Sequence, residues 1–204
     1  AKSHDGGIYV DRKSSSTQIL GNAVIGVSMS PKAPVMTNEF TGGQRVINFA
    51  GIRLDELPTR MINNVVAGSN DRGYIHRAEP CPALRIFNNE ACANTIGVFV
   101  IPQLRGSCQT LALYTIWKAA HIAMFLADVS VGKTVLSYIT LSDSHMGILP
   151  YYTVGRSYRR LFVQDSIIMG STAASSCSAS LNCRAQTDGD PYITSTSCAS
   201  IFGG

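Results

Sequence analysis

The apolar middle of the chain begins with TIGVFVIPQL, residues Thr95–Leu104, and ends with KTVLSYITL, residues Lys133–Leu141. Both stretches are rich in β-branched residues, which favour pleated, half-buried strands. Between them, Ser107–Asp128 carries apolar side chains at the spacing of a helix face: Leu113, Ile116, Trp117, Ala120, Met124 and Ala127. Ser107 suits a helix N-cap, whereas the local run Leu-Tyr-Thr-Ile-Trp also favours a strand. We predict a helix over Ser107–Asp128, with a strand on either side.

Shorter strand candidates flank this middle. They are Gly7–Asp11, Ile19–Met29, Gln44–Ala50, Ala83–Phe87, Gly147–Val154 and Arg160–Ile168. The segment LDELPTRMINNVVA, residues Leu54–Ala67, holds a second helix candidate that begins near Pro58, because proline is tolerated in the first turn of a helix. We find no internal repeat at any period.

Many strands and one or two helices predict a β-rich α+β fold. We expect an antiparallel sandwich or a jelly-roll-like core, formed by residues 1–204 as a single domain. The alternative is a three-layer α/β fold, which requires Thr95–Leu104 and Lys133–Leu141 to be parallel strands flanking the helix.

The six cysteines fall into two groups of three: Cys81, Cys92 and Cys108, then Cys177, Cys183 and Cys198. Because three is odd, full pairing requires at least one disulfide between the groups, and closing so long a loop is worth roughly 4 kcal/mol. Residues 170–204 contain twelve serines and threonines and only three charged residues, a composition that stays disordered unless it is cross-linked. We therefore predict that all six cysteines form disulfides and that residues 170–204 are a disulfide-stapled, loop-rich segment.

The composition indicates where such a chain works. Charged residues make up 15% of it, against about 25% in an average soluble domain. This low charge, together with the cysteines, indicates an extracellular or otherwise oxidising compartment. The net charge of +4 permits weak attraction to an anionic ligand. No uncharged run that is also predominantly apolar reaches the ~18 residues of a membrane span, so we expect no transmembrane segment.

One group of residues has the chemistry of a hydrolase. Cys108 would stand at the start of the predicted helix, after a strand and a turn that contains Ser107. A helix N-terminus lowers the pKa of a thiol, and a strand–turn–nucleophile–helix order is the layout of hydrolase active sites, although the second glycine of that motif is absent here. His121, His145 and Asp143 are the candidate base and acid. His76 lies in a charged segment, and we expect it to be solvated.

A second group of residues suits an anion. The stretch Tyr151–Arg160 interleaves aromatic and basic residues, and its candidate binding residues are Arg156, Tyr158, Arg159 and Arg160. The four histidines and six cysteines show no metal-ligand spacing, so we expect neither a metal nor another cofactor.

Three functions compete on these grounds. The absence of a convergent catalytic set and the many strands favour a secreted or surface structural or binding protein, of the coat, pilus or surface-subunit kind, which would self-associate into a homo-oligomer. The alternative is a secreted esterase or protease with a serine or cysteine nucleophile, so the sequence leaves enzyme activity uncertain. The third is an anion or nucleic-acid binder that uses Arg156, Arg159 and Arg160, whose affinity must fall with salt.

Overall fold

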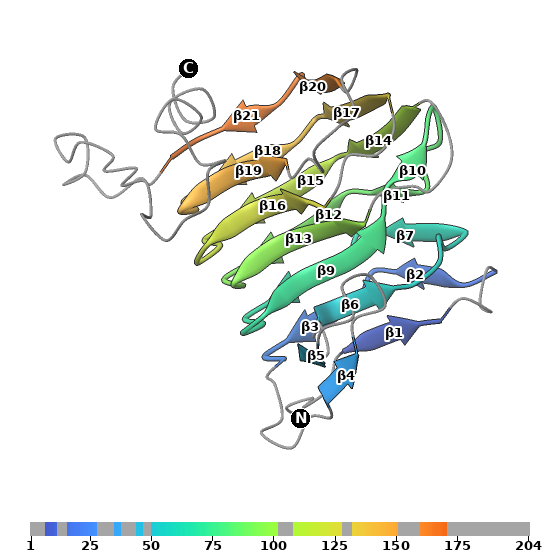
Figure 1. Ribbon diagram of the computed structural model, residues 1–204, viewed down its shortest axis with the longest axis vertical. Coiled ribbons are helices and arrows are strands. Elements are labelled where there is room, and N and C mark those ends of the chain that lie inside the picture. Colours follow the sequence, from blue (N-terminus) through green and yellow to red (C-terminus); the bar gives the residue numbers. More distant parts are fainter. Residues whose placement is uncertain are drawn as a thin grey trace, which may run out of the picture.

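The computed structural model describes residues 7–11, 16–27, 35–37, 44–46, 50–101, 108–127, 132–150 and 160–170, the two short ranges at 35–37 and 44–46 by their backbone alone. In these ranges every regular element is a strand, and the strands stack in parallel sheets that form a β-solenoid (Figure 1). The expected antiparallel sandwich or jelly roll with helices is therefore wrong, and so is the three-layer α/β alternative. The described part of the chain contains no helix that could cross a membrane.

Three faces enclose the solenoid. Sheet A consists of β1 (Ile8–Val10), β6 (Ala50–Leu54), β9 (Arg72–Arg77), β13 (Ile96–Ile101), β16 (Ile122–Leu126) and β19 (Met146–Pro150). Sheet C consists of β3 (Ala23–Ile25), β8 (Val65–Ala67), β12 (Asn89–Cys92), β15 (Tyr114–Trp117), β18 (Thr140–Ser142) and β21 (Ile167–Ile168). Neighbouring strands within both sheets are parallel, so the chain returns to each face once per turn.

The third face is divided between two sheets. Sheet B holds β2 (Gln18–Leu20), β7 (Arg60–Ile62) and β11 (Ile86–Phe87). Sheet E holds β10 (Glu79–Pro80), β14 (Cys108–Ala112), β17 (Lys133–Ser137) and β20 (Arg160–Gln164), of which only β10 pairs in the antiparallel sense. A separate antiparallel pair joins β4 (Val35–Thr37) to β5 (Gln44–Val46).

Two bends per turn set the corners of the solenoid. Before the sheet C strands, the residues with a left-handed backbone recur every 25 residues: Asn63, Asn88, Leu113 and Tyr138. After those strands a second set does the same: Gly68, Ala93, Lys118 and Asp143. The chain therefore has a 25-residue repeat, and the prediction of no repeat is wrong. The backbone conformation and the burial pattern repeat from bend to bend, whereas the residue type repeats only between Asn63 and Asn88.

The same bends account for both mistaken helices. Ser107–Asp128 was predicted as a helix, but its described residues form β14, β15 and β16, separated by bends at Leu113 and Lys118. Alternation along a strand has a period of two, and each bend shifts its phase, so the apolar residues fall three or four apart. Leu54–Ala67 behaves in the same way, since its later residues form β7 and β8 around a bend at Asn63.

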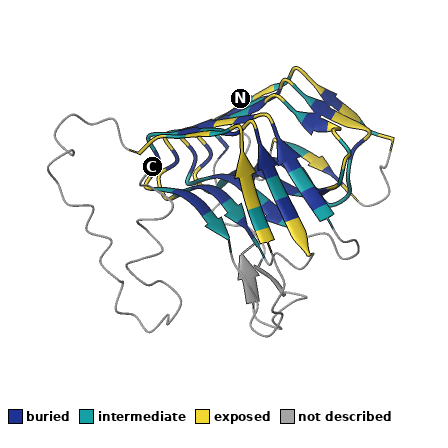
Figure 2. Cartoon of the chain, turned by 90° about the horizontal axis from the view of Figure 1, so that it is seen from above, coloured by how far each residue is buried: buried dark blue, intermediate teal, exposed yellow. Residues whose placement is uncertain are grey.

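The core runs along the axis between the faces (Figure 2). Each sheet A strand contributes residues in register to it, such as Ile52, Val98, Met124 and Ile148, all at most 3% exposed. Buried asparagines occupy corners, where Asn64 and Asn89 stack in successive turns. Because the inward side chains fill this core, a binding site is sought among the outward side chains of the strands.

Candidate functional site on the outer face of sheet A

A row of outward side chains crosses sheet A along the solenoid axis. Direct strand pairing aligns six of them, which we call the axial row: Tyr9, Arg53, Ile75, Phe99, Phe125 and Leu149. Their neighbours along each strand, such as Val98 and Val100, are buried in the core, so alternation points the row to the outside. Tyr9 is 61% exposed, Ile75 is buried, and the other four are half-buried.

The middle of the row is aromatic. The rings of Phe99 and Phe125 stack at 5.0 Å between centroids with 7° between their planes. The guanidinium carbon of Arg72 lies 4.6 Å from the centroid of Phe99, and Arg72 also donates to Asp71 at 2.9 Å. Phe99 is therefore held between a second ring and a cation whose charge Asp71 neutralises.

The first two strands of sheet A carry a polar cluster on the same face. The Tyr9 hydroxyl donates to Asp55 Oδ2 at 2.7 Å, and Arg53 Nε donates to Asp55 Oδ1 at 2.9 Å. The guanidinium of Arg53 lies 5.6 Å from the Tyr9 ring centroid. The hydrogen bond to Asp55 is the main reason that the pKa of Tyr9 is raised. Both oxygens of Asp55 are thus engaged, and the cluster presents a ring and a neutralised ion pair.

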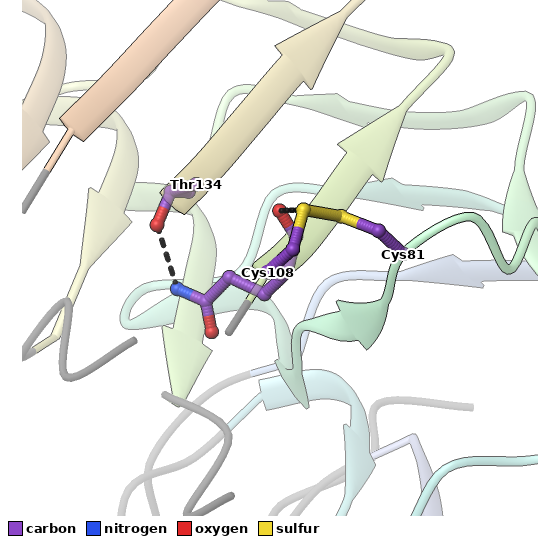
Figure 3. Close-up of a disulfide and its surroundings, with 4 residues drawn as sticks. Cys81, Cys108 and Thr134 are labelled. Atoms are coloured by element: carbon purple, nitrogen blue, oxygen red, sulfur yellow. Dashed lines mark hydrogen bonds between the residues drawn. A yellow bond between two sulfur atoms is a disulfide. The ribbon is translucent and has the colours of Figure 1, made fainter. Parts of the chain in front are cut away.

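The candidate catalytic residues lie on different parts of the solenoid. Cys108 begins β14 on the third face, where it forms a disulfide with Cys81 (Figure 3). A sulfur in a disulfide has no thiol to attack a substrate. His121 and His145 are exposed at the corner between sheets C and A, and Asp143 is a bend residue of the same corner. The structure therefore brings the two histidines into neighbouring turns but does not bring them to Cys108, and Ser107 lies outside the described residues.

The six cysteines fall into three groups: one disulfide pair, one free thiol and three residues outside the described part of the chain. Cys81 and Cys108, with 5.5 Å between their Cα atoms, confirm the prediction of a disulfide for these two residues. Cys92 is a buried free thiol in sheet C, and burial is the main reason that its pKa is raised. Cys177, Cys183 and Cys198 lie outside the described residues. The Cys81–Cys108 disulfide fits an oxidising compartment.

Of the four residues predicted to bind an anion, the structure describes only Arg160. Arg160 is exposed at the start of β20 and pairs directly with exposed Lys133 of β17. Lys133 Nζ lies 4.9 Å from the ring centroid of Phe162, two residues along from Arg160. Arg156, Tyr158 and Arg159 lie outside the described residues. Within the described part of the chain, no three histidine, cysteine or carboxylate side chains cluster in a way that could hold a metal ion.

Sequence reasoning identified none of the axial row as a site. Phe99 lies within the strand predicted over Thr95–Leu104. Alternation along that strand would have placed the Phe99 side chain on the face of the sheet opposite to Val98 and Val100. The signal that could have found the row is the 25-residue spacing of the bends, because it fixes which strands are neighbours and in which register.

Comparison with known proteins adds one relative. The chain is 29% identical over 150 residues to the human protein Fibrocystin-L. The match covers 68% of this chain and spans about 3% of the length of that relative. No protein family and no solved structure shows a significant match.

Proposed function

We propose that this protein is a secreted or surface structural subunit whose solenoid associates with a second copy through the outer face of sheet A. The axial row is the observation that carries the proposal, because it places aromatic and aliphatic side chains where a sheet normally meets water. The Cys81–Cys108 disulfide supports a secreted or surface location.

A second row on the same face extends the apolar area. Arg72, Ile96, Ile122 and Met146 are aligned by direct strand pairing, three residues before members of the axial row, and each is half-buried. A Cβ added at Gly97 would meet Ile116 of the core, and Val98 also points into the core, so alternation is interrupted there and Ile96 turns to the same side as Phe99. The guanidinium of Arg72, 4.6 Å from the Phe99 ring centroid, joins the two rows. Patches of this kind on soluble proteins commonly mark interaction sites.

The charges on this face favour a copy of the same chain as the partner. Among the described residues of this face, Arg53 is paired with Asp55 and Arg72 with Asp71, while Arg77 donates to the carbonyl of Asp55 at 3.3 Å, so two of the three arginines are neutralised within the face. A largely apolar face whose ion pairs are internal can pack against itself across a two-fold axis, and such symmetric dimers are the commonest oligomers.

Light scattering on a size-exclusion column tests the proposal. We expect the wild type to show the mass of a dimer that dissociates on dilution, and Phe99→Asp to shift the protein to a monomer. Tyr138→Asn is the matched control, because Tyr138 is an exposed aromatic residue at a bend away from sheet A, and asparagine tolerates its left-handed backbone. A wild type that stays monomeric at every concentration would overturn the proposal, as would a dimer that Phe99→Asp leaves intact.

A specific observation favours anion binding as a second candidate. Lys133 and Arg160 are directly paired across β17 and β20, an arrangement of like charges that is destabilising unless an anion lies between them. Polyanion binding should weaken steeply as salt is added, and Lys133→Gln with Arg160→Gln should reduce it. Lys118→Gln, on a different corner, serves as the control. Binding that does not respond to salt would exclude this function.

A further inference from the structure

The end of the solenoid formed by the last strands leaves apolar side chains exposed. Leu111, Leu136 and Val163 occupy one row of the third face by direct strand pairing. Leu111 and Leu136 are at most 3% exposed, whereas Val163 is 43% exposed. The core row therefore continues to this end and opens there to solvent, on β20 at the top of Figure 1.

The strand β21 and the residue after it are apolar on both faces. Ile168 packs partly against the core, while Ile167 and Met169 point to the other side and are 57% and 46% exposed. A strand that is apolar on both faces is typical of one that is covered on both. Figure 2 looks down on this end of the molecule.

The backbone at this end is open as well. Ile167 and Met169 donate their amides to the carbonyls of Ile139 and Leu141 in the preceding turn, both at 2.8 Å. Amide directions alternate along a parallel strand, so the amide of Ile168 points towards the open end. Unpaired edge groups of this kind are normally covered by another part of the protein.

The opposite end is closed. Among the inward residues of the first strands, Val10 and Ile19 are only 6% and 3% exposed, and Ile8 and Val24 are half-buried, whereas Val163 at the other end is 43% exposed. Head-to-tail stacking of copies would need an open core at both ends, and only one end has it. A head-to-head pair would need only this end, but the chain that follows Gly170 starts beside it and is the nearer cover.

We propose that residues 171–204 dock on this end and cap the solenoid. The segment starts directly after Gly170, beside β21, so no long connection is needed. It supplies large apolar side chains that could cover the exposed ones, namely Leu181, Tyr192, Ile193, Ile201 and Phe202, and it carries only three charges. Its cysteines would tie the cap together, which gives the predicted stapled segment a place on the fold.

Trypsin cleavage of the unreduced full chain tests the docking. Residues 171–204 contain a single trypsin site, Arg184. We expect slow cleavage there in the wild type and at least tenfold faster cleavage in Val163→Asp, because a buried charge would displace the cap. Phe162→Ser is the matched control, since Phe162 neighbours Val163, is 40% exposed and points away from the core, so its cleavage rate should stay unchanged.

Hydrogen exchange provides a second measurement if Val163→Asp fails to fold. The amide of Ile168 should exchange slowly in the wild type and at least tenfold faster in Ile167→Ser. Rapid exchange of Ile168 in the wild type, or a cleavage rate at Arg184 equal to that in urea, would overturn the proposal. Protection that disappears on dilution would also overturn it, because a second copy would then be the cover. None of these readouts depends on sheet A.

Discussion

The hydroxyl of Tyr114 lies 2.7 Å from Nε2 of His76 in the centre of the solenoid. The two rings stack at 5.8 Å with 10° between their planes, and Nδ1 of His76 lies 2.8 Å from the carbonyl oxygen of Arg77. Since a carbonyl only accepts, Nδ1 carries the proton and Nε2 accepts from the tyrosine. Histidine is therefore neutral here, and its complete burial lowers its pKa from 6.5 to about 4. The expectation that His76 is solvated is wrong.

This pair predicts a loss of stability in acid. Between pH 6.5 and about 4 the unfolded chain binds a proton at His76 that the folded chain excludes. The stabilisation is complete above pH 6.5 and is lost as the pH falls, by about 3 kcal/mol in all. Urea unfolding across this pH range should show a weaker acid dependence in the double variant His76→Phe with Tyr114→Phe, which replaces both hydrogen-bonding partners together.

Glu79 changes the stability with pH in the direction opposite to His76, and it must be separated from the effect of His76. Burial raises the pKa of its carboxyl, so its contribution is lost as the pH rises rather than as it falls. Glu79 is present in both proteins, and its effect cancels when the two pH profiles are subtracted. Superimposable profiles for the wild type and the double variant would contradict the assignment to His76.

A second prediction concerns Asn64, which connects three turns of the solenoid. Its side-chain amide donates to the carbonyl of Ile19 and to Asn89 Oδ1, both at 2.9 Å, and its Oδ1 accepts from the backbone amide of Asn22 at 3.0 Å. Asn64→Ala removes these bonds and leaves buried groups without partners. We expect a loss of about 3 kcal/mol in the free energy of unfolding, measured by urea denaturation.

An asparagine one turn along provides the control for this variant. Asn88 is exposed and has a left-handed backbone with φ of 54°, which glycine adopts without strain. Asn88→Gly should therefore change the unfolding free energy by no more than about 0.5 kcal/mol. Equal effects of Asn64→Ala and Asn88→Gly would show that the buried hydrogen bonds are not what stabilises the corner.

A third prediction concerns the close approach of sheets A and C at Gly97. A Cβ added there would lie 2.4 Å from Cγ2 of Ile116 and 2.5 Å from the carbonyl oxygen of Ala123. Gly97→Ala should lower the unfolding free energy by about 2 kcal/mol, because backbone must shift to make room. Gly21→Asn should have little effect, since a Cβ added at Gly21 would have no neighbouring atom within 4 Å and asparagine tolerates the positive φ of this residue. A thermal melt of Gly97→Ala that matches the wild type would contradict this packing.

How far the sequence predicts the fold is clear from β13 and β15. The strand predicted over Thr95–Leu104 is confirmed over Ile96–Ile101 as β13, where β-branched residues run without a bend, and residues 102–104 lie outside the described residues. The helix predicted across Tyr114–Trp117 is wrong, because the bends at Leu113 and Lys118 imitate helical spacing. A bend can be recognised when it is Gly68, but its equivalents Ala93 and Lys118 carry no such signal. The repeat stays hidden for that reason.

The axial row could not be predicted from the sequence, because it depends on how the strands pair. Phe99 and Phe125 are 26 residues apart, and their stacking depends on the register between β13 and β16. That register follows from the solenoid, not from either strand alone. The presence of a disulfide was easier to predict, because it follows from the number of cysteines. That number does not determine the partner, which is Cys108 rather than Cys92 for Cys81.

The final prediction concerns that disulfide, which joins β14 to the residue after β10. Its closure of a 27-residue separation constrains the unfolded chain by roughly 3.5 kcal/mol in the chain-entropy model. Reductant should therefore lower the melting temperature of the wild type, and Cys81→Ser with Cys108→Ser should show a similar decrease without reductant. The same double variant should respond to reductant less than the wild type does.

Alkylation before and after unfolding separates the cysteines. Without reductant, iodoacetamide should leave Cys81 and Cys108 unmodified even in urea, and a labelled Cys108 would contradict the pairing. Once these two are bonded, Cys92 is left over from its group, so full pairing of the rest requires Cys92 to bond to Cys177, Cys183 or Cys198. Labelling of Cys92 in urea would instead require an unpaired thiol among those three, because the number left to pair is then odd. A non-reducing peptide map distinguishes the two outcomes directly.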